Sequence, residues 1–171
     1  MTRYLPCLLA LFSLTATAQE HGAHVHGAAR LDVAIDGGTV TLLLDSPMDS
    51  LAGFEHRASS AKDKTTLKTL QAALQDAGKL FVLSEAAKCT LQTAKAESPL
   101  FEAAMDSHNH AGHSELEGEF VFQCNSPDKL DALTVNLFDI AANLQDLDVS
   151  LAGPRGQKAT ELSSASRTIS F

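Results

Sequence analysis

Alternation of apolar and polar residues predicts a β-hairpin near the start of the chain. Apolar side chains recur at alternate positions over residues 31–35, a turn sequence follows at 36–38, and the alternation resumes over 40–44. A period of two places these side chains on one face of each strand. We therefore expect two antiparallel strands with one buried face, ended by Ser46-Pro47 and followed by a long connection over residues 46–61.

A helical period then predicts one amphipathic helix over about residues 62–77. Its apolar stripe consists of Leu67, Leu70, Leu74 and Ala77. Ser60, followed three residues later by Asp63, is typical of a capped helix start, and Gly78 is the predicted stop. A short strand is expected next, over residues 80–83.

The most informative pattern is a second hairpin, formed by a strand that begins at Cys89 and a strand over residues 115–124. One face of the later strand carries Leu116, Gly118, Phe120, Phe122 and Cys124, while glutamates at 115, 117 and 119 occupy the other face. If Cys89 lies opposite Cys124, then residue 91 lies opposite 122 and residue 97 opposite 116. This register turns both cysteines and the phenylalanines toward the core.

Short elements are expected in the rest of the chain. Strands are predicted over 133–138 and 147–151 with a helical turn over 139–144 between them, then a tight turn at 153–156 and one or two further strands. Together these elements predict an α+β fold. It consists of a mainly antiparallel sheet with the helix over 62–77 packed on it, and a long histidine-containing loop over 98–115.

The first eighteen residues have the pattern of a signal peptide. Arg3 precedes an apolar stretch that is shorter than the ~18 residues of a membrane span, and Ala16-Thr17-Ala18 resembles a cleavage site. The alternative is an uncleaved membrane anchor. We expect an exported protein with a signal peptide over 1–18, a flexible histidine-containing segment over 19–28 and a single domain over 29–171.

Removal of the signal peptide leaves two cysteines, Cys89 and Cys124. In an exported protein such a pair favours a disulfide. Closing a loop of about 36 residues is worth roughly 3 to 4 kcal/mol in the chain-entropy model. The competing interpretation is a pair of thiolate metal ligands, which an oxidising compartment disfavours.

The chain is acidic, with 21 Asp and Glu residues against 13 Lys and Arg and a formal net charge of −8. This charge disfavours binding to nucleic acids and to anionic membranes. The chain has no tryptophan, and its one tyrosine lies within the predicted signal peptide. It therefore lacks aromatic platforms on which bases or sugars could stack.

Six of the seven histidines form two clusters, His21, His24 and His26 in one and His108, His110 and His113 in the other. Each cluster contains two histidines separated by one residue, which project to the same side of an extended chain roughly 6 to 7 Å apart. Over that gap two imidazoles can converge on one ion at Zn–N distances of about 2.0 to 2.1 Å. Asp106 and Glu115 can add oxygen ligands. The alternative is that polar loops collect histidines that bind no metal.

The seventh histidine, His56, stands alone beside Glu55, and both residues are further candidate metal ligands. A lone histidine is more often a packed or capping residue than a metal ligand. The residues around it do not decide between these roles.

Ligand chemistry favours Zn²⁺ over Cu²⁺ because no cysteine is free and the two methionines of the mature chain form no methionine-rich motif. Ligand type gives only a weak preference for Zn²⁺ over Ni²⁺ or Co²⁺. The sequence contains no HExxH, no GxSxG in a strand-to-helix setting and no phosphate-binding loop. We therefore expect a zinc carrier or buffer, not an enzyme.

Five short stretches resemble the DUF2796 family, in the order in which that family has them. The most specific is Gly53-Phe54-Glu55-His56. The others are His24-Val25-His26-Gly27 before the first strand, Ser46-Pro47-Met48-Asp49, Lys88-Cys89-Thr90-Leu91 and Phe122-Gln123-Cys124. The resemblance extends over essentially the whole mature chain.

The resemblance implies a periplasmic zinc-binding protein that assists zinc uptake. A membrane transporter or an outer-membrane receptor is the implied partner, and His24, His26 and His56 are the family-matching ligands. The family's histidine-rich segment can be much longer than residues 108–113 here, so one or two ions are expected.

The sequence leaves three alternatives to a zinc carrier, namely a copper or nickel chaperone, an envelope interaction module with incidental histidines, and a zinc hydrolase. A histidine from a second molecule could also complete a site at the loop tip, which would give metal-bridged self-association.

Overall fold

A six-stranded sheet with strand order β4-β5-β2-β1-β7-β8 is the largest element of the structure, a computed structural model that describes residues 27–101 and 114–171. Its neighbouring strands are antiparallel except β1 and β7, which run parallel. This arrangement confirms the predicted fold class. The strands are β1 (Ala28–Asp36), β2 (Thr39–Pro47), β4 (Cys89–Glu97), β5 (Glu115–Cys124), β7 (Asp146–Gly153) and β8 (Gly156–Ser163).

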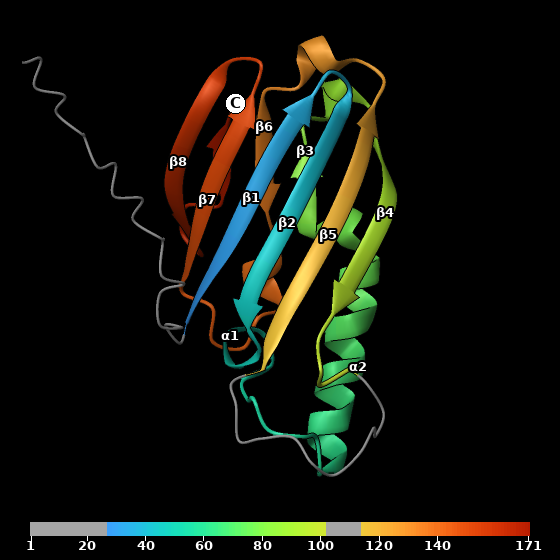
Figure 1. Ribbon diagram of the computed structural model, residues 1–171, viewed down its shortest axis with the longest axis vertical. Helices are drawn as coiled ribbons and strands as arrows, with labels where there is room; N and C mark the ends of the chain where they lie inside the picture. Colours follow the sequence, from blue (N-terminus) through green and yellow to red (C-terminus); the bar gives the residue numbers. More distant parts are fainter. Residues whose placement is uncertain (1–26, 102–113) are drawn as a thin grey trace, which may run out of the picture.

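A second layer covers one face of this sheet (Figure 1). It contains the helices α1 (Met48–Ala52), α2 (Ala61–Gln75) and α3 (Ala77–Leu80), and a small sheet of β3 (Phe81–Leu83), β6 (Ala132–Val135) and β9 (Thr168–Ser170). Three 3-10 turns join these elements, η1 (Glu85–Ala87), η2 (Pro127–Lys129) and η3 (Leu137–Asp139). None of the helices in the described ranges is long and apolar enough to cross a membrane. The predicted signal peptide lies outside those ranges.

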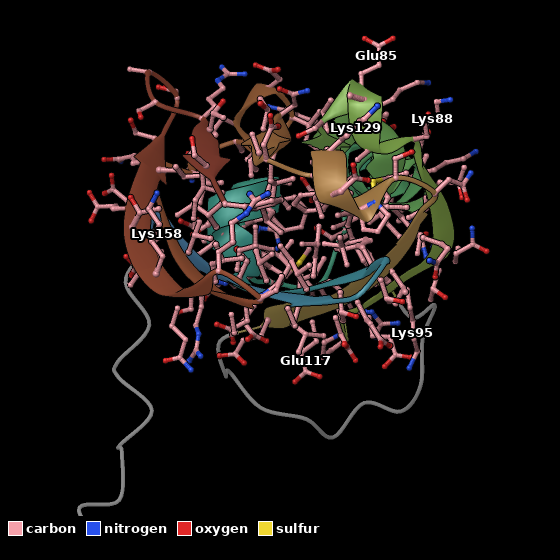
Figure 2. The ribbon with its side chains drawn as sticks, turned by 90° about the horizontal axis from the view of Figure 1, so that it is seen from above. Glu85, Lys88, Lys95, Glu117, Lys129 and Lys158 are labelled. Atoms are coloured by element: carbon pink, nitrogen blue, oxygen red, sulfur yellow. A yellow bond between two sulfur atoms is a disulfide. The ribbon has the colours of Figure 1, made fainter. Side chains whose placement is uncertain are left out.

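The core lies between the two layers, inside the curve of the large sheet, while Lys95 and Glu117 point outward from the sheet (Figure 2). The predicted first hairpin is confirmed as β1 and β2, which pair from Arg30↔Asp45 to Asp36↔Thr39. Ile35 is partly buried, Leu43 on the opposite face is exposed, and the other predicted inward residues are buried, namely Leu31, Val33, Val40, Leu42 and Leu44. Because alternate residues of a strand face opposite sides, one face of the hairpin enters the core and the other faces outward.

The second hairpin pairs Cys89 with Cys124 and Leu91 with Phe122, as predicted. The predicted pairing of 97 with 116 is wrong, because the register shifts between Leu91 and Thr93. The extra residue of this β-bulge places Glu97 opposite Glu117. Sequence periodicity alone does not reveal such a bulge.

Gly118 on β5 leaves space for the aromatic core. A Cβ atom there would lie 2.9 Å from Cε2 of Phe120 and 3.4 Å from Cβ of Leu44. The Phe120 ring packs against Phe81 of the second layer, with their centroids 5.0 Å apart. The glycine thus lets the ring lie flat against the strand between the two layers.

The predicted helix is confirmed as α2, and its stripe residues are buried. The capping box is also present, since the Ser60 hydroxyl accepts a hydrogen bond from the Asp63 amide and the Asp63 carboxylate accepts one from the Ser60 amide. Gly78 is not the stop that the sequence predicted. The helix ends at Gln75, and Gly78 lies inside the following turn α3.

Two further predictions are corrected by the structure. The connection predicted over 46–61 contains α1, which starts directly after β2. The strand predicted over 133–138 ends at Val135, so that the helical turn predicted over 139–144 occurs earlier, as η3. Over residues 133–138 the buried residues Leu133, Val135 and Leu137 keep a period of two, but Leu137 already belongs to η3, so the period alone overstates the length of the strand.

The predicted disulfide between Cys89 and Cys124 is present and links the adjacent strands β4 and β5. Cys124 is buried, and Cys89 packs at the edge of the core. The bond therefore closes the hairpin at the end opposite to its long loop.

Replacing both cysteines, as Cys89→Ala/Cys124→Ala, should lower the free energy of unfolding by roughly 3 to 4 kcal/mol, because the unfolded chain regains the entropy of an open loop. Urea unfolding followed by circular dichroism measures the change. Dithiothreitol should shift the wild-type midpoint toward that of the variant and leave the variant unaffected. Equal midpoints for the oxidised wild type and the variant would contradict this prediction.

Candidate metal-binding end of the domain

Helix α1 lies at the end of the domain where β1 begins, β2 ends and β5 begins (Figure 1). Two histidine-bearing segments of the sequence border described residues at this end. His26 immediately precedes Gly27, and His113 immediately precedes Ser114. The predicted ligands His21, His24, His26, His108, His110 and His113 themselves lie outside the described residues. The structure therefore shows this end through the described residues that adjoin the two segments, Gly27 and Ser114.

Gly27 is held by hydrogen bonds at both its amide and its carbonyl, the first to α1 and the second to the start of β7. Its amide donates to the Ser50 hydroxyl at 3.1 Å, and its carbonyl accepts from the amides of Gln145 and Asp146 at 2.7 and 3.1 Å. Gly27 is buried and has a φ of +85°, a conformation that disfavours any side chain. The residue after His26 is therefore a defined anchor point.

Ser114 forms the corresponding anchor on the other side of α1. Its carbonyl accepts a hydrogen bond from the Met48 amide at 2.8 Å, and its hydroxyl donates to the carbonyl of Glu55 at 3.1 Å. The start of β5 is thus bound both to the first residue of α1 and to the residue before His56.

His56 is exposed and lies four residues beyond the end of α1. Its ring stacks on Phe54 with the centroids 4.9 Å apart and an angle of 22° between the planes. Nδ1 lies 3.1 Å from the carbonyl oxygen of Arg57. A carbonyl oxygen only accepts hydrogen bonds, so Nδ1 carries the proton of the neutral ring and Nε2 keeps its lone pair. This is the arrangement that metal-binding histidines usually have.

The start of α2 places a carboxylate near His56. The pKa of Asp63 is lowered, mainly because its carboxylate accepts hydrogen bonds from the capping residue Ser60, with a smaller contribution from the charge of His56. Glu55, the other residue predicted beside His56, is half-buried.

A hollow of about 670 Å³ opens where β4 and β5 lead into the long loop. Its lining includes three carboxylates, Glu97, Glu115 and Glu117, together with Phe101 at the last residue described before the loop. Glu97 and Glu117 are directly opposed across the strands, which is unfavourable for like charges. Lys95 offsets this repulsion through a salt bridge to Glu97, with Nζ 3.0 Å from Oε1.

The pKa of Lys95 reflects the negative potential around the hollow. It is raised because the ammonium group donates a hydrogen bond to Glu97 and is attracted by the charge of Glu97, with smaller contributions from Glu119 and Glu117. Three carboxylates line the hollow and one of them is paired with Lys95, so the entrance to the histidine-bearing loop carries a net negative charge that attracts cations.

Within residues 27–101 and 114–171, no group of three or more His, Cys, Asp or Glu side chains is arranged to hold a metal ion. The predicted ligands in this range, His56 and Glu55, thus do not form a complete site with other described residues. Sequence reasoning identified Glu115 but missed Ser50, Ser114 and the opposed pair Glu97 and Glu117. A single serine in a connection has no sequence signature, and the pairing of Glu97 depends on the β-bulge.

These features describe an α+β domain that has one disulfide in its described residues and histidine-bearing segments that border one of its ends. Residues 23–171 match the ZrgA family of zinc uptake proteins. The chain belongs to that family. DUF2796 is an equivalent name, so the predicted resemblance is confirmed. Comparison with individually curated proteins gives no match. A role in zinc uptake follows from the family.

The tautomer of His56 can be tested directly. In zinc-free protein at pH 8, long-range ¹H–¹⁵N correlation spectra should show the His56 ring protonated at Nδ1, because that proton is shared with the Arg57 carbonyl. The His56→Gln variant assigns the signal by its disappearance. A ring that carries its proton mainly on Nε2 would show that the hydrogen bond does not form in solution.

Proposed function

We propose that this protein is a periplasmic zinc-binding protein that captures Zn²⁺ through His24, His26, His56 and the histidines of the 108–113 segment. It assists zinc uptake or buffers zinc in the envelope. The family supports the role in zinc uptake. The choice of ligands is based on the residues and on the geometry of the end that carries α1.

The observation that carries the proposal is the convergence of three segments on α1. Gly27, one residue after His26, bonds to Ser50. Ser114, one residue after His113, bonds to Met48. The same Ser114 hydroxyl binds the carbonyl next to His56. Consecutive Cα atoms are only 3.8 Å apart, so these anchors limit how far His26 and His113 can lie from α1.

Imidazole chemistry suits Zn²⁺ at such a site. Neutral imidazole nitrogen is a common zinc ligand, and the stack on Phe54 and the bond to Arg57 hold His56 with Nε2 available. Protons compete with zinc for the same nitrogens, whose ordinary pKa is about 6.5. Zinc affinity should therefore be high above this pH and fall as the pH drops through the histidine range.

The carboxylates of the hollow contribute electrostatics. Glu97, Glu115 and Glu117 line the entrance to the histidine-bearing loop and lower the potential there. A negative potential raises the local concentration of a divalent cation and its rate of association. These groups steer the ion, while the imidazoles coordinate it.

Capture and release fit this arrangement better than catalysis does. A catalytic zinc ion is normally held by rigid elements with an open coordination position. The proposed ligands are distributed over a segment before β1, the connection after α1 and a hairpin loop. We propose a carrier that passes zinc to a membrane transporter or an outer-membrane receptor. A ligand from a second molecule would give a metal-bridged dimer.

Replacing the histidines should abolish tight zinc binding. Zinc affinity should fall at least roughly 10- to 100-fold, the cost of losing even a residue that only hydrogen-bonds to a ligand, in each of three variants: His24→Ala/His26→Ala, His56→Ala and His108→Ala/His110→Ala/His113→Ala. Titration calorimetry of protein purified without a histidine tag measures the affinity. Thermal unfolding of the zinc-free variants serves as the control for folding.

Three outcomes would contradict parts of the proposal. Unchanged affinity and stoichiometry in the variant that lacks all these histidines would reject the ligand assignment. Copper binding that exceeds zinc binding far beyond the usual order of divalent-metal affinities would identify a copper chaperone instead. Ester or phosphoester hydrolysis that chelation abolishes would identify an enzyme.

Removing charge from the hollow should slow zinc association. In Glu97→Gln/Glu117→Gln the association rate constant at low salt should fall several-fold, because steering by the negative potential is lost, and the difference should shrink at high ionic strength. Stopped-flow mixing with a zinc-sensitive dye measures the rate. The matched control is Asp148→Asn/Glu161→Gln, which removes two carboxylates from the paired strands β7 and β8. An equal effect in the control would show that only the net charge matters.

A further inference from the structure

We infer that Ser50 is a positioning residue for the amino-terminal histidine pair, because it ties Gly27 to α1 and so sets the point from which His24 and His26 extend. The inference rests on the proposed function. It assigns a role to a residue that binds no metal itself.

Ser50 is completely buried and uses its hydroxyl on both sides. Oγ accepts the hydrogen bond of the Gly27 amide at 3.1 Å and donates to the Ala28 carbonyl at 3.0 Å. A buried hydroxyl is costly unless it forms hydrogen bonds, and here both partners belong to one short stretch of backbone. Both hydrogen bonds of the Ser50 hydroxyl therefore go to the backbone at the start of β1.

The position of Ser50 does not itself depend on this hydroxyl. Its carbonyl accepts a hydrogen bond from the Asn143 amide at 3.0 Å, and the neighbouring Leu51 carbonyl accepts one from Ala142 at 3.0 Å. The other buried residues of α1 are Met48, Leu51 and Ala52. Ser50→Ala therefore removes the link to Gly27 while α1 keeps its own contacts.

Gly27 completes the link from the other side. Its φ of +85° turns the chain, and a Cβ atom there would lie 3.3 Å from the carbonyl oxygen of Asn143 and 3.3 Å from Nε2 of Gln145. Gly27→Ala should disturb the same anchor by a different route. It adds strain and a close contact but leaves the Ser50 hydroxyl in place.

Anchoring matters because zinc coordination must fix the backbone conformation of the segment that carries His24 and His26. Restricting a backbone residue costs roughly 1 to 2 kcal/mol of conformational entropy at 25 °C, and residues already held in the free protein do not incur that cost on binding. The same helix also holds Ser114 through Met48 and leads to His56. Ser50 therefore sets the starting point of His24 and His26 relative to the other proposed ligands.

A double-mutant cycle tests this role. Zinc affinity is measured by calorimetry for the wild type, Ser50→Ala, His24→Ala/His26→Ala and the combined variant, all in the full mature chain without a tag. Ser50→Ala should weaken binding about fivefold in the wild-type background, as expected for loss of one hydrogen bond. It should cause no change when His24 and His26 are absent, because there is then no ligand pair to position.

The matched control is Ser84→Ala. Ser84 likewise binds backbone of another segment, since its hydroxyl accepts from the amides of Asp131 and Ala132. It lies directly after β3 in the small sheet, away from α1. The control should lower the melting temperature and leave zinc affinity unchanged. A purely structural role of Ser50 would produce this same pattern.

The outcomes separate this inference from the proposed function. Unchanged affinity in Ser50→Ala, or equal weakening in both backgrounds, would overturn the role of Ser50 while the histidine ligands stand. Unchanged affinity in His24→Ala/His26→Ala would reject those ligands, and with them the role of Ser50. If Ser50→Ala does not fold, Gly27→Ala takes its place in the cycle and must show the same dependence on His24 and His26.

Discussion

Burial of one face of the six-stranded sheet is the constraint on which the rest of the structure depends. Because side chains alternate along each strand, the register that buries Leu42, Leu44 and Phe120 also determines what faces outward. On β5 the first three outward positions are Glu115, Glu117 and Glu119, and the inward end carries Cys124. The disulfide to Cys89 then holds β4 against β5 in the same register. The position of the acidic hollow at the opposite end of this hairpin follows from these pairings.

Helix α1 links the sheet to the proposed metal-binding end. It is five residues long, too short to be stable alone, and it forms because Met48, Leu51 and Ala52 are buried between β2 and the segment around Asn143. Its hydrogen bonds reach the residues that follow two histidine-bearing segments, and His56 lies in the connection that leaves it. A structural element with almost no local stability thus brings together segments far apart in the sequence.

Membership of a zinc uptake family and the chemistry of this end support one another. The imidazoles proposed as ligands exchange protons near neutral pH, and Glu97, Glu115 and Glu117 place negative charge beside the loop that carries three of them. Such a division between coordination and attraction suits the proposed role of a zinc carrier. Glu117 and Lys95 point outward from the sheet, so this attraction acts on the face turned away from the core (Figure 2).

The sequence by itself determined the elements whose signals are local. Strict alternation predicted both hairpins, and the cysteine and phenylalanine pattern predicted the disulfide and most of its register. The leucine stripe with the Ser60 cap predicted α2. The histidine clusters and the Gly-Phe-Glu-His stretch pointed to zinc and to the family, although six of the seven histidines lie outside the residues that the structure describes. These features depend on neighbouring residues, so a linear pattern contains them.

Only the tertiary structure decided the features that arise between distant segments. The parallel pairing of β1 with β7, the bulge that brings Glu97 opposite Glu117, and the short helix α1 have no local signature. The same holds for the end of α2, which stops at Gln75 before Gly78 is reached, while Ala77 and Leu80 are buried in the next turn. In each case the burial of side chains against another element outweighs the weak preference of the local sequence, and that balance becomes visible only when the elements are assembled.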